Sequence, residues 1–452
     1  MLAKFGVENY KSFSEAVELN LVSSSKIRDK QEHRSVIRTN ASLLKYGAIY
    51  GANAAGKSNL ISALSFVVDT VRYGLKTDCR RLYCRNRKEN RDRDSLFELQ
   101  FEIDDRFYAY GFAARLCDAR ITHEWLYELK TNGEAKTIFE RFAGGKPSLG
   151  SSLKLTAEEK NRFDTYASDF RENEKDMFLT EMNRGKRIDE SSSLQIFRKI
   201  YSYITKKIVI ITPSSPVMNF QRYYDSRSII EMSSLIQCFD TGVTDVVIEK
   251  IDMGELRRKI PEDVLREMLR ELRERQDRTG TSVARVSGRT DNAFFSIDIN
   301  ENSEPVITTV RFRHGSSDSL FDFEEESQGT IRLFDYLDML LKNEDEVVYL
   351  VDELECSMHP MLLEIFLKLF FKHNEEKRVQ LIFTTHEVSL MDNDLFRRDE
   401  IWFVERNSEN NSTIFPLDRF RERCDRKLGK AYLEGRYGAV PMIRKYELLE
   451  GF

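Results

Sequence analysis

The stretch that decides the fold of this chain is Gly51-Ala52-Asn53-Ala54-Ala55-Gly56-Lys57-Ser58. It matches the P-loop pattern G-x-x-x-x-G-K-[ST] at every fixed position. The apolar run Tyr46 to Tyr50 comes before it, and residues Asn59 to Val71 follow with helical spacing. Strand, loop and helix are the context that this pattern requires, because the glycines let backbone N–H groups approach phosphate at the positive end of the helix. We therefore predict a phosphate-binding loop.

The predicted loop also assigns roles to individual residues. Lys57 is expected to bind the β- and γ-phosphates of a nucleotide, and Ser58 is expected to ligate Mg²⁺. ATP and Mg²⁺ are therefore the expected ligands. The nucleotide-binding set predicted here is Gly51, Ala52, Asn53, Ala54, Ala55, Gly56, Lys57, Ser58 and Asn59.

The composition of the chain limits its class. With 452 residues, 41% hydrophobic and 32% charged, we expect a soluble globular protein of two or three domains. The net charge of −5 provides no global positive field for nucleic acid. The six cysteines form no C-x-x-C pair, and neither a signal peptide nor a membrane-spanning run is expected. These features predict a cytoplasmic location without membrane contact.

A second acidic motif lies far along the chain. Residues 347–351 are an apolar run that ends in Asp352 and Glu353. A fully apolar run is typical of a strand buried on both faces of a parallel sheet, and ligands bind at the carboxyl ends of such strands. Asp352 is predicted to hold Mg²⁺ as the Walker-B acid, and Glu353 to act as the base that orients and polarises the attacking water.

Two further segments are candidates for contacts with phosphate. Residues 379–383 form another apolar run that ends near His386, which we predict to contact the γ-phosphate or the attacking water. Ser327-Gln328-Gly329-Thr330 precedes a helical run. Ser327 and Thr330 are suited to cap that helix, and Gly329 permits close backbone approach. The segment is either an ordinary helix N-terminus or a second phosphate-binding edge that acts on a nucleotide held by another subunit.

In the rest of the chain, the hydrophobic pattern predicts strands and helices, and two segments are rich in basic residues. Residues 97–142 alternate with period two over several runs and predict an antiparallel meander. Residues 151–207 are mostly helical in pattern, and Pro261 to Arg275 is amphipathic. Cys79 to Asp94 and Arg419 to Lys430 are rich in Lys and Arg. Each is either a solvated surface or a contact for nucleic acid or an acidic protein.

These motifs, in this order, resemble those of ABC-type ATPase heads. The resemblance rests on the P-loop, Ser327 to Thr330, Asp352-Glu353, the run 356–360 and His386. The chain resembles the SMC-like and OLD-like branch of that superfamily, in which Asn9-Tyr10-Lys11-Ser12-Phe13 looks like the N-terminal strand and loop. Within that branch the chain is similar to the OLD-type ATPases of bacterial phage-defence operons, which include the ATPase component of the PARIS system. The resemblance covers roughly residues 1–115 and 310–452.

The resemblance implies a fold and a shared nucleotide site. The fold class is α/β, an ABC/SMC-type P-loop ATPase head with a mixed central sheet, an antiparallel β-subdomain and a helical insert. Lys11 joins the nucleotide-binding residues, and two heads sandwich ATP so that Ser327 and Gly329 of one face the γ-phosphate held by Lys57 of the other. Departures are Ala54, where many relatives have glycine, and a loose signature. The Q-loop glutamine is not placed, with Gln100 and Asn183 as the two candidates.

The expected domain organisation follows from the same motifs. Residues 1–120 and 306–452 are predicted to form the ATPase head, and residues 121–305 a β/helical insert for oligomerisation or partner docking. The OLD nucleases carry a nuclease domain after the ATPase, and the chain after His386 is shorter than such a domain. We therefore expect an ATPase without nuclease activity of its own, acting with a separate effector protein.

Two functions compete at this point. One is a nucleotide switch that acts as a sensor or scaffold in anti-phage defence. It would work as a dimer of heads or a higher homo-oligomer, respond to a phage-derived trigger, and control a toxin or a TOPRIM-type nuclease. The alternative is a RecF/SMC-like DNA-repair ATPase that binds DNA, for which the two basic segments are the motivating feature.

Overall fold

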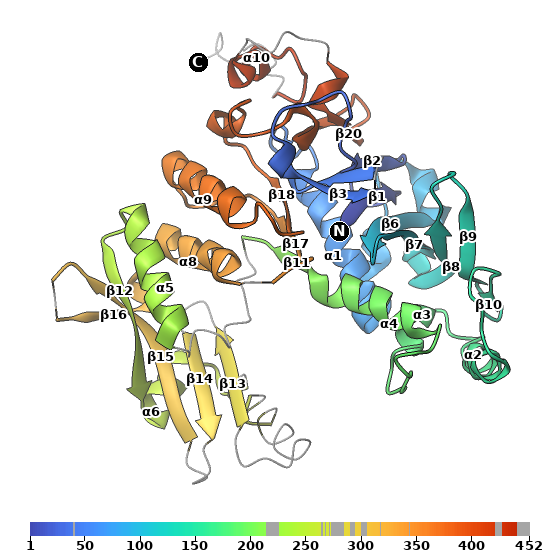
Figure 1. Ribbon diagram of the computed structural model, residues 1–452, viewed down its shortest axis with the longest axis horizontal. Coiled ribbons are helices and arrows are strands. Elements are labelled where there is room, and N and C mark those ends of the chain that lie inside the picture. The colour runs from blue at the N-terminus through green and yellow to red at the C-terminus, as the bar shows by residue number, and fades with distance from the viewer. Residues whose placement is uncertain are drawn as a thin grey trace. The chain divides into compact units, whose positions relative to one another are not determined.

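The computed structural model describes residues 1–38, 41–213, 226–263, 265–266, 268–270, 272, 284–289, 294–299, 305–316, 318–342, 344–420 and 427–440 (Figure 1). The chain forms two compact units. The first consists of Met1–Ile210, Glu344–Leu354 and Asn374–Phe452, and the second of Ile211–Asn343 and Glu355–His373.

A six-stranded mixed sheet forms the centre of the first unit. Its order is β11-β17-β18-β5-β19-β20, in which β17, β18, β5 and β19 run parallel and β20 returns antiparallel to β19. All residues of β5, β17 and β18 are buried, as their apolar sequences predict. The carboxyl ends of four parallel strands therefore meet at one edge. The strands are β5 (Tyr46–Tyr50), β11 (Ile208–Ile211), β17 (Val348–Val351), β18 (Gln380–Thr384), β19 (Ile401–Arg406) and β20 (Ser412–Pro416).

A seven-stranded antiparallel sheet is the second layer of this unit. Its order is β10-β9-β8-β7-β6-β1-β2. The predicted meander over residues 97–142 is confirmed, because β6 to β9 pair in sequence with antiparallel register. The strands are β1 (Leu2–Glu8), β2 (Val17–Asn20), β6 (Ser95–Ile103), β7 (Arg106–Arg115), β8 (Arg120–Leu129), β9 (Ala135–Phe142) and β10 (Ser148–Leu149), beside a small sheet of β3 (Arg34–Arg38) and β4 (Ala41–Leu44).

Helix α1 (Lys57–Tyr73) is shared by the cores of both sheets. Its apolar residues, from Leu60 to Val71 at helical spacing, join one core cluster with residues of the antiparallel sheet and of β17 and β18. The helix ends at Gly74, which has φ +75° and donates its N–H to Thr70 O at 2.9 Å. Because α1 begins at Lys57, this packing fixes the position of the P-loop. Four more helices in this unit are α2 (Ala157–Asp169), α3 (Phe178–Glu181), α4 (Gln195–Ser202) and α10 (Leu428–Leu433).

The second unit is built on an antiparallel sheet of order β12-β15-β14-β13, with β16 paired to β15. Phe295, Ile297 and Ile307 form a core with α6, and Phe312 packs edge-on against Phe334 of α8. Helices thus cover both faces of the sheet. The elements are α5 (Ser226–Ile236), β12 (Val243–Ile251), α6 (Met253–Lys259), β13 (Ala284–Arg289), β14 (Phe294–Ile299), β15 (Pro305–His314), β16 (Leu320–Asp322), α8 (Gln328–Leu341) and α9 (Pro360–His373).

The α/β fold class predicted from the sequence is confirmed, with its mixed sheet and antiparallel β-layer. Of the helix predicted over Pro261 to Arg275, the described residues between 262 and 272 are helical, and Pro261 is not. The remaining residues of the predicted helix lie outside the described part of the chain. The proposed boundaries of head and insert stay a prediction. By packing, the stretch 121–305 is divided at Ile211 between the two units. None of the helices in the described ranges is both long and apolar enough to cross a bilayer.

Candidate functional site

The P-loop requires both of its fixed glycines. A Cβ atom on Gly51 would lie 2.4 Å from the carbonyl oxygen of Val404. Gly56 has φ +118°, and a Cβ there would lie 2.3 Å from Oγ of Ser412. Ala54 adopts φ +59°, a left-handed conformation that costs less for glycine. Ala54 therefore keeps the left-handed backbone conformation at a position where the resembling families often have glycine.

Two serines from opposite ends of the sequence hold this loop in place. Ser412, the first residue of β20, donates from Oγ to Ala55 O (2.5 Å) and from its N–H to Ser12 O (2.7 Å). Oγ of Ser12 lies 2.8 Å from Oγ of Ser412 and accepts a hydrogen bond from Asn59 Nδ2 at 2.8 Å. These hydrogen bonds fix the loop on the side that faces Ser12 and Ser412, and they leave its other side accessible to a ligand.

The N-terminus of α1 carries no side-chain cap. Its N-cap residue is Gly56, and no acidic residue stands in the first turn. The first N–H groups of a helix have no partner within the helix, and together with the helix dipole they favour an anion. The first turn of α1 therefore has the chemistry of a phosphate site.

Lys57 and His386 meet beside the loop. The Lys57 side chain is buried and donates from Nζ to Gly51 O (2.9 Å) and Ala52 O (3.2 Å). Nε2 of His386 lies 2.8 Å from the same Nζ. The sequence separates these residues by more than three hundred positions, and the parallel pairing of β18 with β5 brings them together.

The two acids after β17 are positioned by a threonine of β18. Oγ1 of Thr384 donates to Asp352 Oδ1 at 2.6 Å and accepts the backbone N–H of Glu353 at 2.8 Å. Glu353 has φ +51°, a left-handed backbone conformation that non-glycine residues seldom adopt. Thr384 is fully buried, so both acids are tied to the interior of the sheet.

Most of the predicted site residues line one cavity of about 530 Å³. It brings together the loop from Asn53 onward, the start of α1, Glu353 and His386. Its size is in the range of small-molecule sites. The lining residues are Asn53, Ala54, Ala55, Gly56, Lys57, Ser58, Asn59, Glu353, His386 and Arg406.

Some predicted residues lie off this cavity. Nζ of Lys11 donates to Ser62 Oγ of α1 at 2.6 Å, and burial lowers the pKa of Lys11 while attraction to Asp352 opposes that shift. Gln100 donates to Glu98 on β6, and Asn183 donates to backbone carbonyls near α3 and α4. Neither candidate for the Q-loop residue lines the cavity.

Sequence reasoning missed two residues of the site. Thr384 directly follows the apolar run 379–383, and its contact with both acids depends on the register of β17 and β18. Arg406 belongs to none of the motifs in the sequence. The available signal was the apolar run from Ile401 to Val404, a further buried strand with a polar residue at its carboxyl end.

The predicted signature segment lies in the second unit. Ser327 is the N-cap of α8, and its Oγ accepts the N–H of Thr330 at 3.1 Å. A Cβ on Gly329 would lie 2.6 Å from Ser357 O, so this glycine is required for close approach. Ser357 has φ +61°. The segment 327–330 and the run 356–360 are therefore packed together.

The oxygen donors predicted to hold Mg²⁺ are Ser58, which lines the cavity, and Asp352, which is not among its lining residues. Mg²⁺ usually takes one or two carboxylates, a hydroxyl and substrate phosphates, and keeps waters. Ser58 and Asp352 supply a hydroxyl and a carboxylate of that kind. In the described part of the chain, no group of three or more His, Cys, Asp or Glu side chains is arranged to hold a metal ion by itself.

The basic segment from Cys79 to Asp94 is partly used within the first unit. Arg87 pairs with Glu15 and Glu409, and Arg93 pairs with Glu8. Five other cations of the segment are exposed: Arg80, Arg81, Arg85, Lys88 and Arg91. In the second basic segment, residues 421–426 lie outside the described residues.

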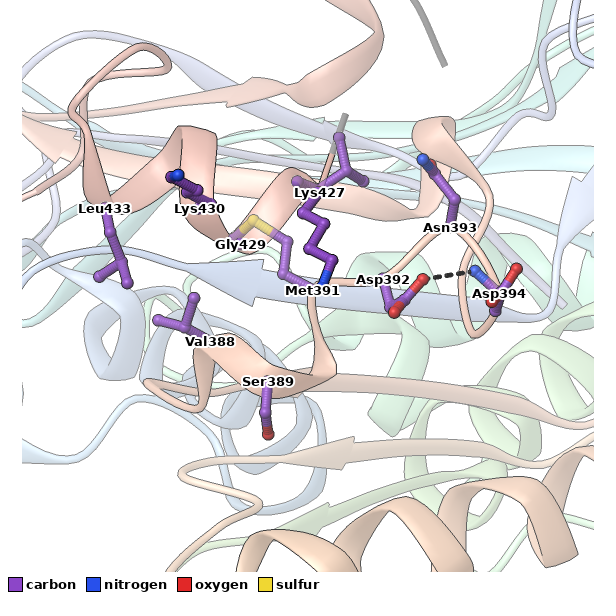
Figure 2. A pocket seen from close by; sticks show the side chains of 11 residues that line it. Val388, Ser389, Met391, Asp392, Asn393, Asp394, Lys427, Gly429, Lys430 and Leu433 are labelled. Carbon is purple, nitrogen blue, oxygen red and sulfur yellow. Dashed lines mark hydrogen bonds between the residues drawn. The ribbon is translucent and has the colours of Figure 1, made fainter. Parts of the chain in front are cut away.

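A second cavity, of about 650 Å³, lies between the short helix Val388–Leu390 and α10 (Figure 2). Val388 and Leu433 form an apolar side, and Asp392 accepts the N–H of Asp394 at 2.8 Å. Gly429 permits the close approach of α10, since a Cβ there would lie 2.9 Å from Val388 O. This cavity shares no lining residue with the P-loop cavity.

Comparison with known proteins gave one family match. Residues 253–392 match a family model described as "AAA domain, putative AbiEii toxin, Type IV TA system". The matched stretch contains Asp352, Glu353, Thr384 and His386, and the P-loop lies before it. A search among curated proteins found no match.

Solved structures of SMC heads are similar over most of the chain. An SMC head bound to the C-winged helix domain of ScpA is 14% identical, covers 92% of this chain and 97% of its own, and has a TM-score of 0.39. The SMC head domain from Thermotoga maritima is 14% identical, with coverage of 92% and 98% and a TM-score of 0.33. The similarity to an AAA domain is therefore limited to residues 253–392, and the P-loop lies outside that stretch.

Proposed function

We propose that this chain binds ATP with Mg²⁺ at the P-loop and hydrolyses it to ADP and phosphate. One observation carries the proposal: Lys57, Glu353 and His386, which follow three neighbouring parallel strands of the mixed sheet, line a single cavity with the uncapped start of α1. A cation, a carboxylate base and free helix N–H groups are the components that phosphoryl transfer to water requires.

In this mechanism the chain's own residues orient the substrate and move one proton. The loop N–H groups hold the β-phosphate, and Lys57 neutralises charge that builds up on the β- and γ-oxygens. Glu353, fixed by Thr384, orients and polarises the attacking water as general base. Ser58 and Asp352 would hold Mg²⁺, which supplies charge neutralisation when bound.

His386 is positioned to form a hydrogen bond with the γ-phosphate. Its ring lies against Lys57 Nζ, so a phosphate oxygen bound by Lys57 would be within reach of the imidazole. Because Nε2 accepts from the Lys57 ammonium, the N–H of the neutral ring is on Nδ1, and that N–H can donate to an oxyanion. We therefore assign His386 to the γ-phosphate and not to the base end of the nucleotide.

Release of phosphate from ATP by the purified chain tests this function. We expect turnover with Mg²⁺ and its loss on addition of EDTA. Glu353→Gln should bind ATP and hydrolyse it slowly, whereas Glu376→Gln, which changes an exposed acid of the same unit, should behave as wild type. Normal turnover by Glu353→Gln would show that the base is assigned wrongly.

We also propose that the active form is a homodimer of heads or a higher homo-oligomer. Its support is the second phosphate-binding candidate, Ser327 and Gly329 at the start of the 14-residue helix α8, in a unit that does not contain the P-loop. In the resembling families such a segment serves the nucleotide of the other copy. Sedimentation of Glu353→Gln with and without ATP tests this, and an unchanged monomer mass with saturating ATP would contradict it.

The biological role that we favour is a nucleotide switch in anti-phage defence. The family description names a toxin of a type IV toxin–antitoxin system, and the motifs resemble those of OLD-type ATPases, PARIS included. On this proposal a phage-derived trigger changes the ATP-bound assembly, which then controls a separate toxin or TOPRIM-type nuclease. Loss of phage resistance in Lys57→Ala cells supports it. Resistance equal to wild type would refute it.

The alternative is a RecF/SMC-like ATPase that acts on DNA. The observation that favours it is the group of five exposed cations between Arg80 and Arg91. Contacts of this kind weaken steeply as salt rises, because binding releases counterions from the phosphates. Fluorescence anisotropy with duplex and single-stranded DNA over a salt series, together with ATPase stimulation, decides between the two roles.

A further inference from the structure

We propose that Arg406 binds the nucleotide at its ribose and α-phosphate end. This inference rests on the proposed ATP-binding function and adds a residue that no motif predicted. Arg406 is the last residue of β19 and lines the P-loop cavity.

The register of β19 places Arg406 alongside the loop. β19 runs parallel to β5, with Ile401 opposite Ala48 and Phe403 opposite Tyr50. Since β5 ends at Tyr50, the next residues of β19 run beside the P-loop itself. The close approach of Val404 O to Gly51 is direct evidence of this path. The carboxyl end of a parallel strand next to the P-loop is a position where α/β sheets bind ligands.

The backbone of Arg406 is held firmly. It pairs with Ser412 in the β19–β20 hairpin, and Ser412 is hydrogen-bonded to Ala55 O within the loop. The turn between the strands is ordered by Asn407, whose Oδ1 accepts the N–H groups of Glu409 and Asn411 at 3.0 and 2.9 Å. The distance between the arginine backbone and the phosphate cradle is therefore set by hydrogen bonds.

The side chain of Arg406 is available for a ligand. It is exposed, and it has no hydrogen bond or ion pair to the rest of the described chain. The other cation of the cavity, Lys57, is already in contact with the P-loop carbonyls and His386. A guanidinium can bind two phosphate oxygens at once or stack on a planar base, which a lysine does less well.

The order of strands determines which end of the nucleotide it meets. Asp352, Glu353 and His386 follow β17 and β18, which lie on one side of β5, and β19 lies on the other side. The reacting γ-phosphate belongs with the acids and His386. Arg406, across the loop, therefore contacts the portion that ATP and ADP share.

If Arg406 binds this end of the nucleotide, its removal should weaken the affinity for ADP and ATP and change kcat very little. For Arg406→Ala we expect the Kd values of fluorescent mant-ADP and mant-ATP to rise by the same factor, about tenfold, the low end for a hydrogen bond to a charged group because the site is exposed. The value of kcat at saturating ATP should stay within about twofold of wild type, since uniform binding changes KM alone. Arg406→Lys should lie between the two.

The control is Arg171→Ala, which removes an exposed cation away from the cavity. It should leave both Kd values unchanged. An unchanged Kd for mant-ADP in Arg406→Ala, a loss confined to mant-ATP, or an equal loss in Arg171→Ala would each overturn the inference. Arg406→Gln replaces the alanine variant if the latter has a lowered melting temperature.

Failure of this inference is distinct from failure of the proposed function. If the wild-type chain binds neither mant-ADP nor mant-ATP, the ATPase proposal fails and the inference fails with it. If wild type binds both and Arg406→Ala binds them equally well, the ATPase proposal stands and only the role of Arg406 is refuted.

Discussion

Two helix N-termini in this chain have similar sequences of small and polar residues but different chemistry. Helix α1 begins after Gly56, in a left-handed conformation and without a side-chain cap. Helix α8 begins after Ser327, whose hydroxyl accepts the N–H of Thr330 and lies 2.9 Å from the Thr330 hydroxyl. The first helix leaves its N–H groups for an anion, and the second already satisfies one of them internally.

The difference shows how a phosphate site is distinguished from an ordinary helix start. An N-cap serine stabilises the helix by about 1 kcal/mol and weakens its need for an external anion. A left-handed glycine gives up that stabilisation and exposes the N–H groups. We therefore expect α1 to bind phosphate within one chain, and α8 to take part only when a phosphate is presented by another copy.

The strongest test of this contrast removes the cation of the α1 site. Lys57→Ala should lower kcat/KM for ATP by roughly a thousandfold, because the β- and γ-phosphate charge is left without its buried partner. Phosphate release and mant-ATP titration measure the effect. Lys88→Ala, at an exposed position, is the matched control. Turnover close to wild type in Lys57→Ala would mean that the nucleotide lies elsewhere.

The second substitution, at Glu353, is expected to slow the hydrolysis step without weakening the binding of ATP. Glu353→Gln should lower kcat about a hundredfold, the usual range for a general base, and leave the Kd for ATP nearly unchanged. Single-turnover hydrolysis separates the two quantities. A rise in Kd that matches the fall in kcat would instead assign Glu353 to binding.

Thr384→Val tests how the acids are positioned. The variant leaves the N–H of Glu353 and one oxygen of Asp352 without their buried partner, and we expect kcat to fall about tenfold with a loss of stability of about 1–3 kcal/mol. Denaturant unfolding gives the stability. Thr413→Val, on the exposed side of β20, should change neither quantity.

The smallest effect is expected at the capped helix. Ser327→Ala should lower the stability of the second unit by about 1 kcal/mol and leave the affinity of the chain for mant-ADP unchanged. Thermal unfolding and titration measure these. If Ser327→Ala weakened mant-ADP binding as strongly as Lys57→Ala, the distinction between the two helix starts would be false.

The sequence predicted the P-loop strand, α1, and the strands that end in Asp352 and near His386. Each of these has a strong local pattern and a short-range context. Strand β12 was not predicted, because its residues are mostly half-buried and show no alternation. Thr384 and Arg406 could not be assigned, since their roles depend on strand order and register rather than on any local pattern.

The hydrogen bonds between Ser12, Ser412 and Ala55 have a consequence for the order of folding. The loop that would bind nucleotide is held by two serines that lie 400 positions apart in the sequence. A chain still growing has a P-loop sequence without the β19–β20 hairpin that fixes it. Pairing over such separations is slow, because a long loop must close before the contact forms. Nucleotide affinity should therefore appear only after this long-range pairing has formed.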